Sequence, residues 1–244
     1  MSEPRKGYPR SKGLHGQIVQ ALGRRIVQGD WTPGAVLPTE ERLCDELGVG
    51  RSALREAVKV LAGKGLLQTR TSAGTSVCSS PSWNLLDPDV LAWRFTPSPS
   101  PADIVVLANL RVALEPGAAR LAAESADTTA RRSVELAMAK LWATVDIPEA
   151  FIQADLEFHR AIFIASANDL LLYIHDAVNI ATSAVRPLHT HSVNHNRDTL
   201  DNHNRVAVAI RKGHHRQAEE AMRTVVEVAR EDVLQADKMT EPAR

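Results

Sequence analysis

The sequence predicts a mainly α-helical protein with a small N-terminal domain that carries a β-hairpin and a larger C-terminal domain made of helices alone. Three observations support this prediction. Hydrophobic residues make up 44% of the 244 residues and aromatic residues only 4%, a composition that favours helix packing over a β-sandwich. Apolar positions recur at helical spacing along most of the chain. The charges are unevenly distributed, although 29 basic and 29 acidic side chains cancel overall.

The uneven charge distinguishes the two parts of the chain. Residues 1–80 contain 12 basic and 7 acidic side chains, a net charge of +5, so residues 81–244 carry −5. A basic segment joined to an acidic one predicts an anionic partner, such as nucleic acid, for the N-terminal part.

The N-terminal domain is expected to follow a disordered arm. Residues 1–12 contain charged residues, Pro and Gly without periodicity. Apolar residues at helical spacing predict a helix over 14–27, which Gly29 ends. A second helix is expected to start after Thr39, whose side chain can cap it, and to end at Gly48.

A third helix and a β-hairpin complete this domain. The helix is predicted over residues 51–62, since Gly63 follows it. Strands are predicted over 66–70 and 75–78, joined by a tip of small residues. Two helices joined by a short Gly-containing turn and followed by a hairpin form a winged helix-turn-helix domain, predicted here for residues 13–79.

A linker and a helical bundle follow. Residues 80–101 are rich in Pro and Ser and should hold one short helix, which Asp87 caps and Pro88 begins. An antiparallel all-α bundle of six to seven helices is predicted over residues 102–237, before a tail of residues 238–244. The expected helices span residues 102–125, 128–145, 149–166, 169–186, 198–212 and 214–236.

The helix from Arg51 has the pattern of a DNA-reading helix. Arg51, Arg55 and Lys59 recur at one-turn intervals beside the Ser52 hydroxyl, on a face about 90° from the apolar stripe. Arg can bind guanine or clamp phosphates, and Ser can bind either. The alternative is a solvated basic face on an ordinary helix. The order of helices and wing, together with the basic charge, favours DNA binding.

Three motifs in this domain resemble the winged-helix domain of GntR-superfamily transcription regulators. They are LPTEERL (37–43), GVGRSALREA (48–57), and GLLQ (65–68) with GTSV (74–77), and the resemblance spans about residues 11–78. It implies that the third helix contacts operator DNA and that the hairpin tip enters the minor groove. The DNA-binding residues expected are Arg42, Gly50, Arg51, Ser52, Arg55, Arg70 and Gly74.

A group of potential metal ligands lies in the bundle. Asp155 and His159 are one helical turn apart on an otherwise apolar face, where they could pair with each other or bind a ligand. An ion pair without a metal is the simpler interpretation of these two residues alone. His203 could supply a third ligand of similar chemistry. His214 and His215 are expected to be exposed to solvent.

Further polar residues could bind an effector. Arg111 lies among leucines and either reaches the surface or clamps a carboxylate. His175, Asn179, Ser183 and Arg186 recur along one helix, which gives either a solvated face or a wall that binds sugar hydroxyls.

Residues 103–236 resemble the helical ligand-binding domain, called FCD, of the FadR-type branch of the superfamily. The resemblance implies a divalent metal, zinc above all, held by Asp155, His159 and His203, with Arg111 in the effector pocket. In many relatives a further His on the last helix completes the metal site, but Val225 occupies that position here and cannot coordinate.

The segment 83–93 is similar to the linker of galactonate-operon repressors, which implies a small sugar acid as effector. The effector-binding residues expected are Arg111, Asn179 and Ser183.

The leading hypothesis is a homodimeric, cytoplasmic repressor, not an enzyme, that releases double-stranded operator DNA when a small carboxylate binds. One alternative is a metal-dependent hydrolase in which Asp155, His159 and His203 activate water. Another is an activator or a DNA-binding protein that ignores ligands. The two isolated cysteines fit a reducing cytosol, and no apolar run of membrane-spanning length or signal segment is expected.

Overall fold

The computed structural model forms two compact units, Met1–Thr96 and Pro97–Arg244, and each unit is described by itself. The residues that the structure describes are 13–70, 74–97, 99–125, 127–188 and 193–240. The predicted arm 1–12 and the last four residues of the predicted tail lie outside these ranges. Among the described residues, no helix is both long and apolar enough to cross a membrane.

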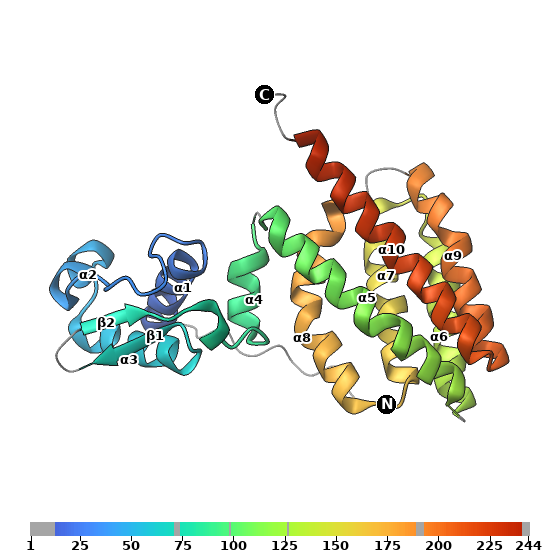
Figure 1. The fold of residues 1–244 in the computed structure, drawn as a ribbon, viewed down its shortest axis with the longest axis horizontal. Coiled ribbons are helices and arrows are strands. Elements are labelled where there is room, and N and C mark those ends of the chain that lie inside the picture. Colours follow the sequence, from blue (N-terminus) through green and yellow to red (C-terminus); the bar gives the residue numbers. More distant parts are fainter. Residues whose placement is uncertain (1–12, 71–73, 98, 126, 189–192, 241–244) are drawn as a thin grey trace. The chain divides into compact units, whose positions relative to one another are not determined.

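The first unit has the predicted order of helices and hairpin (Figure 1). Its elements are α1 (Leu14–Val27), α2 (Glu40–Leu47), α3 (Arg51–Gly63), β1 (Leu67–Arg70), β2 (Gly74–Val77), the 3-10 helix η1 (Ser80–Ser82) and α4 (Pro88–Phe95). The caps of α2 are as predicted: the Thr39 side chain accepts a hydrogen bond from the Arg42 amide at 3.4 Å. Gly48 ends the helix in the left-handed conformation that favours glycine.

The wing contains a third short segment that the sequence analysis did not predict. β1 and β2 pair antiparallel, with Leu67 opposite Val77 and Arg70 opposite Gly74. Val36 forms a further antiparallel bridge with Ser76, and the Leu37 amide donates to the Thr75 carbonyl at 2.8 Å. The chain before α2 therefore lies along the outer edge of β2. The tip, residues 71–73, lies outside the described residues.

Helix α4 packs within the first unit, although the sequence analysis placed it in a linker. Trp93 is almost fully buried in the core that α1 and α3 share, and its indole nitrogen donates to the Gln20 side-chain oxygen at 2.7 Å. The Lys64 ammonium lies 2.7 Å from Asp87 and 2.9 Å from Asp89. The boundary between the two units accordingly follows α4, at Thr96.

The second unit is the predicted all-helical bundle. Its helices are α5 (Pro101–Glu124), α6 (Thr128–Ala143), α7 (Pro148–Ala165), α8 (Asp169–Val185), α9 (Val193–Lys212) and α10 (His215–Thr240), with a 3-10 turn η2 (Arg186–Leu188) after α8. Helix α9 begins at Val193 rather than near residue 198, so part of the predicted polar loop is helical. Helix α10 continues to Thr240, beyond the predicted end of the domain.

Helix α7 is enclosed by its neighbours in this bundle. It packs against α5, α6 and α8, while α9 packs against α5, α6 and α10, and α5 runs along α10 (Figure 1). Small buried residues of α5, such as Ala119 and Ala122, allow these helices to approach closely. Phe158 of α7 is fully buried at the centre. Polar side chains on the inner faces of α7 and α9 are therefore removed from solvent.

Candidate functional site

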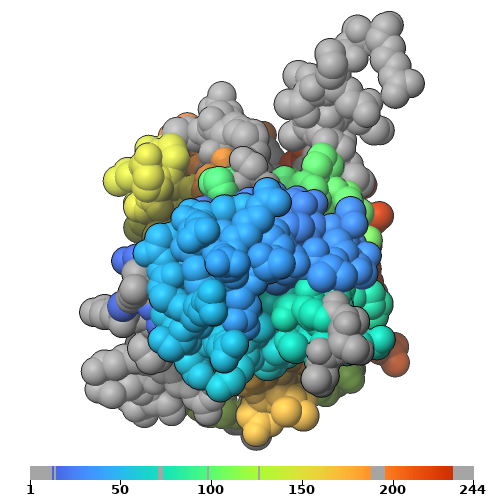
Figure 2. All heavy atoms as spheres, turned by 90° about the vertical axis from the view of Figure 1, so that its left-hand side faces the viewer, coloured from blue at the N-terminus to red at the C-terminus, as the bar shows by residue number. Residues whose placement is uncertain are grey.

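The exposed face of α3 carries the residues expected to read DNA. Leu54, Ala57 and Leu61 are buried against the core, whereas Arg51 and Arg55 are exposed beside Ser52. In Figure 2 the blue-to-cyan atoms of α2 and α3 form one continuous surface, and the teal atoms of the wing strands adjoin it. A recognition helix next to a wing is the arrangement that docks into a major groove with a neighbouring backbone or minor-groove contact.

The arginines on this surface are held by exposed carboxylates. Arg55 lies 3.0 Å from Glu40, and Arg42 lies 3.2 Å from Glu46. The contact of Arg51 with Glu41 is looser, at 3.9 Å. Exposed ion pairs contribute about 0–1 kcal/mol, so DNA phosphates or bases can replace these carboxylates at little cost.

The three predicted metal ligands meet inside the second unit. Asp155 and His159 come from α7 and His203 from α9, and one potential ligand atom from each lies within 4.8 Å of the others. The Asp155 Oδ1 atom is 3.2 Å from His203 Nε2 and 3.7 Å from His159 Nε2. All three side chains are buried.

The hydrogen-bond partners of His203 determine which of its nitrogens faces the cluster with a lone pair. Its Nδ1 atom is 2.8 Å from the Thr199 carbonyl oxygen, which can only accept, so Nδ1 carries the hydrogen. Burial, with a smaller effect of His159, lowers the pKa of His203 to about 3, so the ring is neutral. Its Nε2 lone pair consequently faces the Asp155 carboxylate, which is also an acceptor.

His159 is oriented in the same way by Glu115 of α5. The His159 Nδ1 atom lies 2.6 Å from Glu115 Oε2, which places a hydrogen on Nδ1 and leaves Nε2 facing Asp155. Buried acceptor atoms that face one another are unfavourable without a cation near them, and the Arg186 guanidinium is the cation beside Asp155 and His159 in this structure. Zinc is commonly bound by imidazole nitrogens and carboxylates, and the cluster offers two Nε2 atoms and one carboxylate. Each histidine also donates its Nδ1 hydrogen to a further acceptor, as is usual for histidines that bind zinc. The residues present therefore fit a divalent metal.

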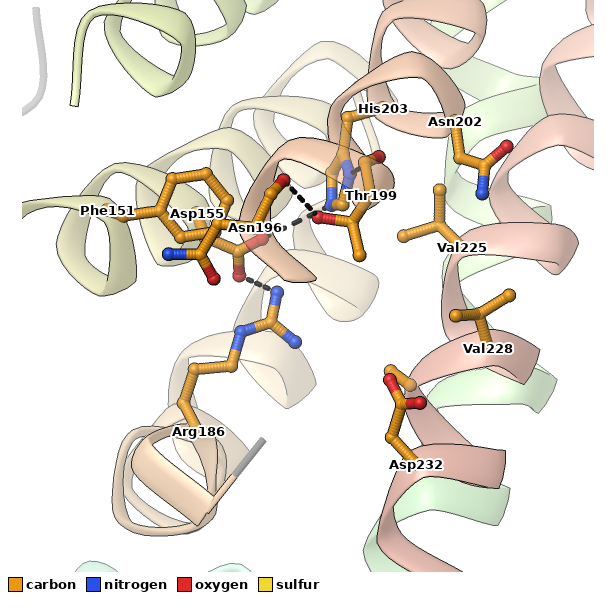
Figure 3. A pocket seen from close by; sticks show the side chains of 11 residues that line it. Phe151, Asp155, Arg186, Asn196, Thr199, Asn202, His203, Val225, Val228 and Asp232 are labelled. Carbon is orange, nitrogen blue, oxygen red and sulfur yellow. Dashed lines mark hydrogen bonds and ion pairs between the residues drawn. The ribbon is translucent and has the colours of Figure 1, made fainter. Parts of the chain in front are cut away.

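Two arginines surround this cluster, Arg186 buried and Arg111 largely buried. Arg111 Nε donates to Glu115 Oε1 at 2.5 Å, and the Arg186 guanidinium contacts Asp155 Oδ2 (Figure 3). Burial acts to raise the pKa of Glu115, but the charge of Arg111 and the hydrogen bonds from His159 and Arg111 outweigh it and hold that pKa well below 4.5. Burial and the charge of Arg111 lower the pKa of Arg186 to about 9, so Arg186 is still a cation at neutral pH.

A pocket opens beside the candidate metal ligands. It encloses about 470 Å³, counting the space open to solvent, and Val225 of α10 stands across it from Asp155 and His203 (Figure 3). Asn196 lines the same pocket and is 1% exposed, yet neither atom of its amide has a hydrogen-bond partner among the residues that the structure describes. An amide with both a donor and an acceptor unused suits the hydroxyl groups of a ligand.

The predicted effector residues have different surroundings. Arg111 lines two smaller cavities, one of them shared with Arg186, and its side chain is only 11% exposed. Asn179 and Ser183 are half-buried and line none of the three pockets described, so their role stays a prediction.

Of the two alternatives for the polar residues of α8, a solvated face or a wall that binds sugar hydroxyls, the solvated face does not hold at His175 and Arg186. His175 is buried and stacks on Phe163, with ring centres 4.3 Å apart, and burial lowers the pKa of His175 to about 4. Arg186 is also buried. His214 and His215 are exposed, as predicted.

Sequence reasoning missed Glu115, Asn196 and the contact between Arg186 and Asp155. The signal for Glu115 was its position one turn after Arg111. Asn196 had no signal of its own, since it lay in a segment predicted to be a loop.

Comparison with known proteins supports both units. The description "Bacterial regulatory proteins, gntR family" matches residues 14–77, and "FCD domain" matches residues 106–228. The chain is 34% identical to the galactonate operon transcriptional repressor of Escherichia coli K12, over 69% of this chain and 74% of that protein. It is 35% identical to the uncharacterized HTH-type transcriptional regulator YieP of the same organism, over 66% and 70%.

Solved structures share the fold. The chain matches the Listeria monocytogenes regulator Lar with a TM-score of 0.60 and 18% identity, covering 93% of this chain and 98% of that one. Escherichia coli McbR/YncC matches with a TM-score of 0.53 and 17% identity, covering 91% and 98%.

The family decides between the alternatives that the buried cluster left open. The matching domains and curated relatives are regulators of transcription, so the hydrolase hypothesis for Asp155, His159 and His203 is wrong. The gntR match implies DNA binding by the first unit, and the FCD match implies a small-molecule effector for the second. This chain belongs to the gntR family of bacterial regulatory proteins and is a transcription regulator with an FCD domain.

Proposed function

We propose that this regulator is a homodimeric repressor that leaves its operator when a small sugar acid, of the aldonate type, binds in the FCD unit beside a divalent metal. The observation that carries the proposal is the buried meeting of Asp155, His159 and His203, with Arg186 lining both the pocket beside Asp155 and His203 and a second cavity that it shares with Arg111. A sugar acid offers a carboxylate to the guanidinium groups and hydroxyls to the Asn196 amide. The galactonate operon repressor among the relatives supports this class of effector.

Asp155, His159 and His203 would hold the metal, with zinc the first candidate. When bound, the metal supplies positive charge and coordination positions for the oxygens of the acid. Val225 adds no donor on the α10 side of the pocket, so affinity rests on three protein ligands. Glu115 and the Thr199 carbonyl keep the two imidazole rings turned toward the metal position.

In the DNA-binding unit, Arg51, Ser52 and Arg55 would contact bases and phosphates from α3. Arg42, Gly50, Arg70 and Gly74 would contact the backbone or the minor groove. Two copies of the chain would place two α3 helices on the half-sites of one operator, which is the basis for proposing a dimer. The acid lowers DNA affinity only if it binds more tightly to the arrangement of units that does not fit DNA.

The proposal is tested with duplexes that the protein selects from a random DNA library. Binding of a selected duplex is followed by fluorescence anisotropy. Arg51→Ala should weaken specific binding about tenfold or more, because an arginine contact to a base is worth about 1–3 kcal/mol. Arg24→Ala removes an exposed arginine of α1 and is the matched control, expected to have a much smaller effect.

D-Galactonate and D-gluconate are then titrated into the protein–DNA complex, with and without zinc, and D-galactose serves as the uncharged control. The acids should weaken DNA binding and the neutral sugar should not. Unchanged DNA binding by Arg51→Ala would contradict the DNA-reading assignment. Acids that leave DNA binding unchanged, or strengthen it, would contradict the repressor mechanism.

A further inference from the structure

We propose that Arg186 is an internal cation of the buried site that competes with the metal for Asp155, so that metal binding is weak until an anionic ligand takes over the guanidinium group. The inference rests on the proposed function for the metal site and for the acid. Its core, the competition between Arg186 and a metal, can be tested with zinc alone.

The position of Arg186 supports the competition directly. It is the first residue of η2, and its guanidinium group contacts Asp155 Oδ2 and lies 3.4 Å from His159 Nε2. It therefore touches two of the three groups that would hold a metal. In Figure 3 the side chain extends from the end of α8 toward the Asp155 carboxylate. Arg186 is only 7% exposed, so these interactions take place away from bulk water.

The charges around the cluster are balanced by the two arginines. Asp155 and Glu115 are the buried carboxylates, and Arg186 and Arg111 are their buried cationic partners. His203 is neutral. A divalent cation placed among these groups would add two positive charges within a few ångströms of Arg186. Like charges repel strongly where the dielectric constant is low, so a metal and Arg186 cannot both bind Asp155 without a large cost.

A second cavity offers Arg186 another partner. It is lined by both Arg111 and Arg186, together with Thr182 and apolar residues of α5 and α10. A carboxylate between two guanidinium groups can accept hydrogen bonds from both. An acid bound there would draw Arg186 away from Asp155 and cancel part of the added charge. Acid and metal should then increase each other's affinity, since coupling between two ligands is reciprocal.

The test measures zinc affinity of the full-length chain by competition with a chromophoric zinc chelator, in the absence of any acid. Arg186→Gln should bind zinc at least tenfold more tightly than the wild type. Arg160→Gln is the matched control, because Arg160 is an exposed arginine that pairs with Asp176 at 2.8 Å and touches none of the metal ligands. Its zinc affinity should equal that of the wild type.

Arg186→Met is the second variant, because it keeps the apolar stem and should also raise zinc affinity. It replaces Arg186→Gln in the test if that variant does not fold, as judged by circular dichroism. Equal zinc affinity of the wild type and the folded Arg186 variants would overturn the proposal, as would folded variants that bind no zinc.

The coupling is tested by repeating the titration with D-galactonate. The acid should raise the zinc affinity of the wild type by about fivefold or more and leave that of Arg186→Gln nearly unchanged. An acid effect of equal size in both proteins would overturn the role of Arg186 in the coupling. Tighter zinc binding by Arg186→Gln, combined with no effect of any acid on the wild type or on DNA binding, would support the competition and contradict the proposed effector instead.

Discussion

At the scale of single residues, what the buried cluster can bind depends on which ring nitrogen of each histidine carries the hydrogen. The alternatives for Asp155 and His159 were an ion pair or a metal site. Asp155 does form an ion pair, but its partner is Arg186, which comes from the far end of α8. The Nδ1 atoms of both histidines are engaged by Glu115 and Thr199, which turns the Nε2 atoms toward Asp155. Glu115 and Thr199, which lie outside the cluster, thus determine which atoms it offers to a metal.

Asn196 gives a prediction at this scale. Its buried amide has no partner in the described part of the chain, which costs about 1–3 kcal/mol, so Asn196→Leu, which keeps the branch at Cγ and can extend into the pocket, should stabilise the protein. We expect thermal unfolding of the variant at a temperature about 2–6 °C higher. Binding of D-galactonate, measured by calorimetry with zinc present, should weaken about tenfold because the hydroxyls lose a partner.

Asn202→Leu is the control for this prediction. Asn202 lines the same pocket but is half-buried, so water can already satisfy its amide and its replacement should not stabilise the fold. A lower unfolding temperature of Asn196→Leu together with unchanged acid binding would show that the Asn196 amide serves the fold and not a ligand.

Sequence reasoning found the site residues whose signal is local. The four-residue spacing of Asp155 and His159 places both on one helix face in any setting. The contact of Arg186 with Asp155 could not be found in this way, since a polar residue at a helix end looks the same in the sequence whether it faces water or another helix. Its burial depends on how α8 packs against α7, which is a tertiary property.

At the scale of elements, α4 depends on a glycine of α1. The Trp93 ring lies so close to Gly23 that a Cβ atom on Gly23 would come within 2.3 Å of it. Gly23 is helical and needs no special backbone conformation. Glycine is required here because the absence of a side chain leaves space for the indole ring of Trp93. The packing of α4 against α1 therefore requires a residue without a side chain at this position.

Gly23→Ala should consequently destabilise the first unit. In an open helix position the change would stabilise by about 1 kcal/mol, because Ala is the better helix former. Here the clash with Trp93 should reverse the sign and cost about 1–3 kcal/mol. Urea unfolding followed by tryptophan fluorescence measures the change, since three of the four tryptophans, Trp31, Trp83 and Trp93, lie in this unit.

Gly63→Ala is the matched control, because it lies at the end of α3 and an added Cβ would have no atom within 4 Å. We expect it to be neutral or slightly stabilising. If Gly23→Ala were equally neutral, the close packing of α4 on α1 would be contradicted.

Helix ends were predictable where a single residue caps the helix. Thr39 and Asp87 each accept a hydrogen bond from a backbone amide in the first turn, as predicted from the sequence. The start of α9 was not predictable, because residues 193–197 are mostly polar and show no apolar period. The bridge between Val36 and Ser76 was missed since it joins segments far apart in the chain.

At the scale of the whole molecule, the two units should respond differently to acid. Burial lowers the pKa of His175 to about 4 and that of His203 to about 3, whereas an unfolded histidine titrates near 6.5. Between these values the unfolded second unit binds more protons than the folded one, so its stability falls as the pH drops below 6.5. Glu115, with its lowered pKa, acts in the same direction below pH 4.5.

We therefore expect two calorimetric transitions in the presence of a metal chelator. Between pH 7 and pH 5, the transition of the second unit should move to lower temperature more than that of the first, in which His15 is the only histidine. Tryptophan fluorescence assigns the first unit's transition. His175→Phe keeps an aromatic ring against Phe163 and should reduce the pH dependence. If both unfolding temperatures shifted equally between pH 7 and pH 5, the attribution of the pH dependence to His175 and His203 would be contradicted.

The burial of Trp93 also matters for the exchange of sensor domains between regulators. A chimeric protein joined after Thr96 retains the contacts of Trp93 with Gln20 and of Lys64 with Asp87. A junction near residue 80 would remove α4 and leave an apolar surface of α1 open to aggregation. The natural point for such an exchange is therefore the peptide bond between Thr96 and Pro97, where a new sensor receives the DNA-binding domain with its fourth helix in place.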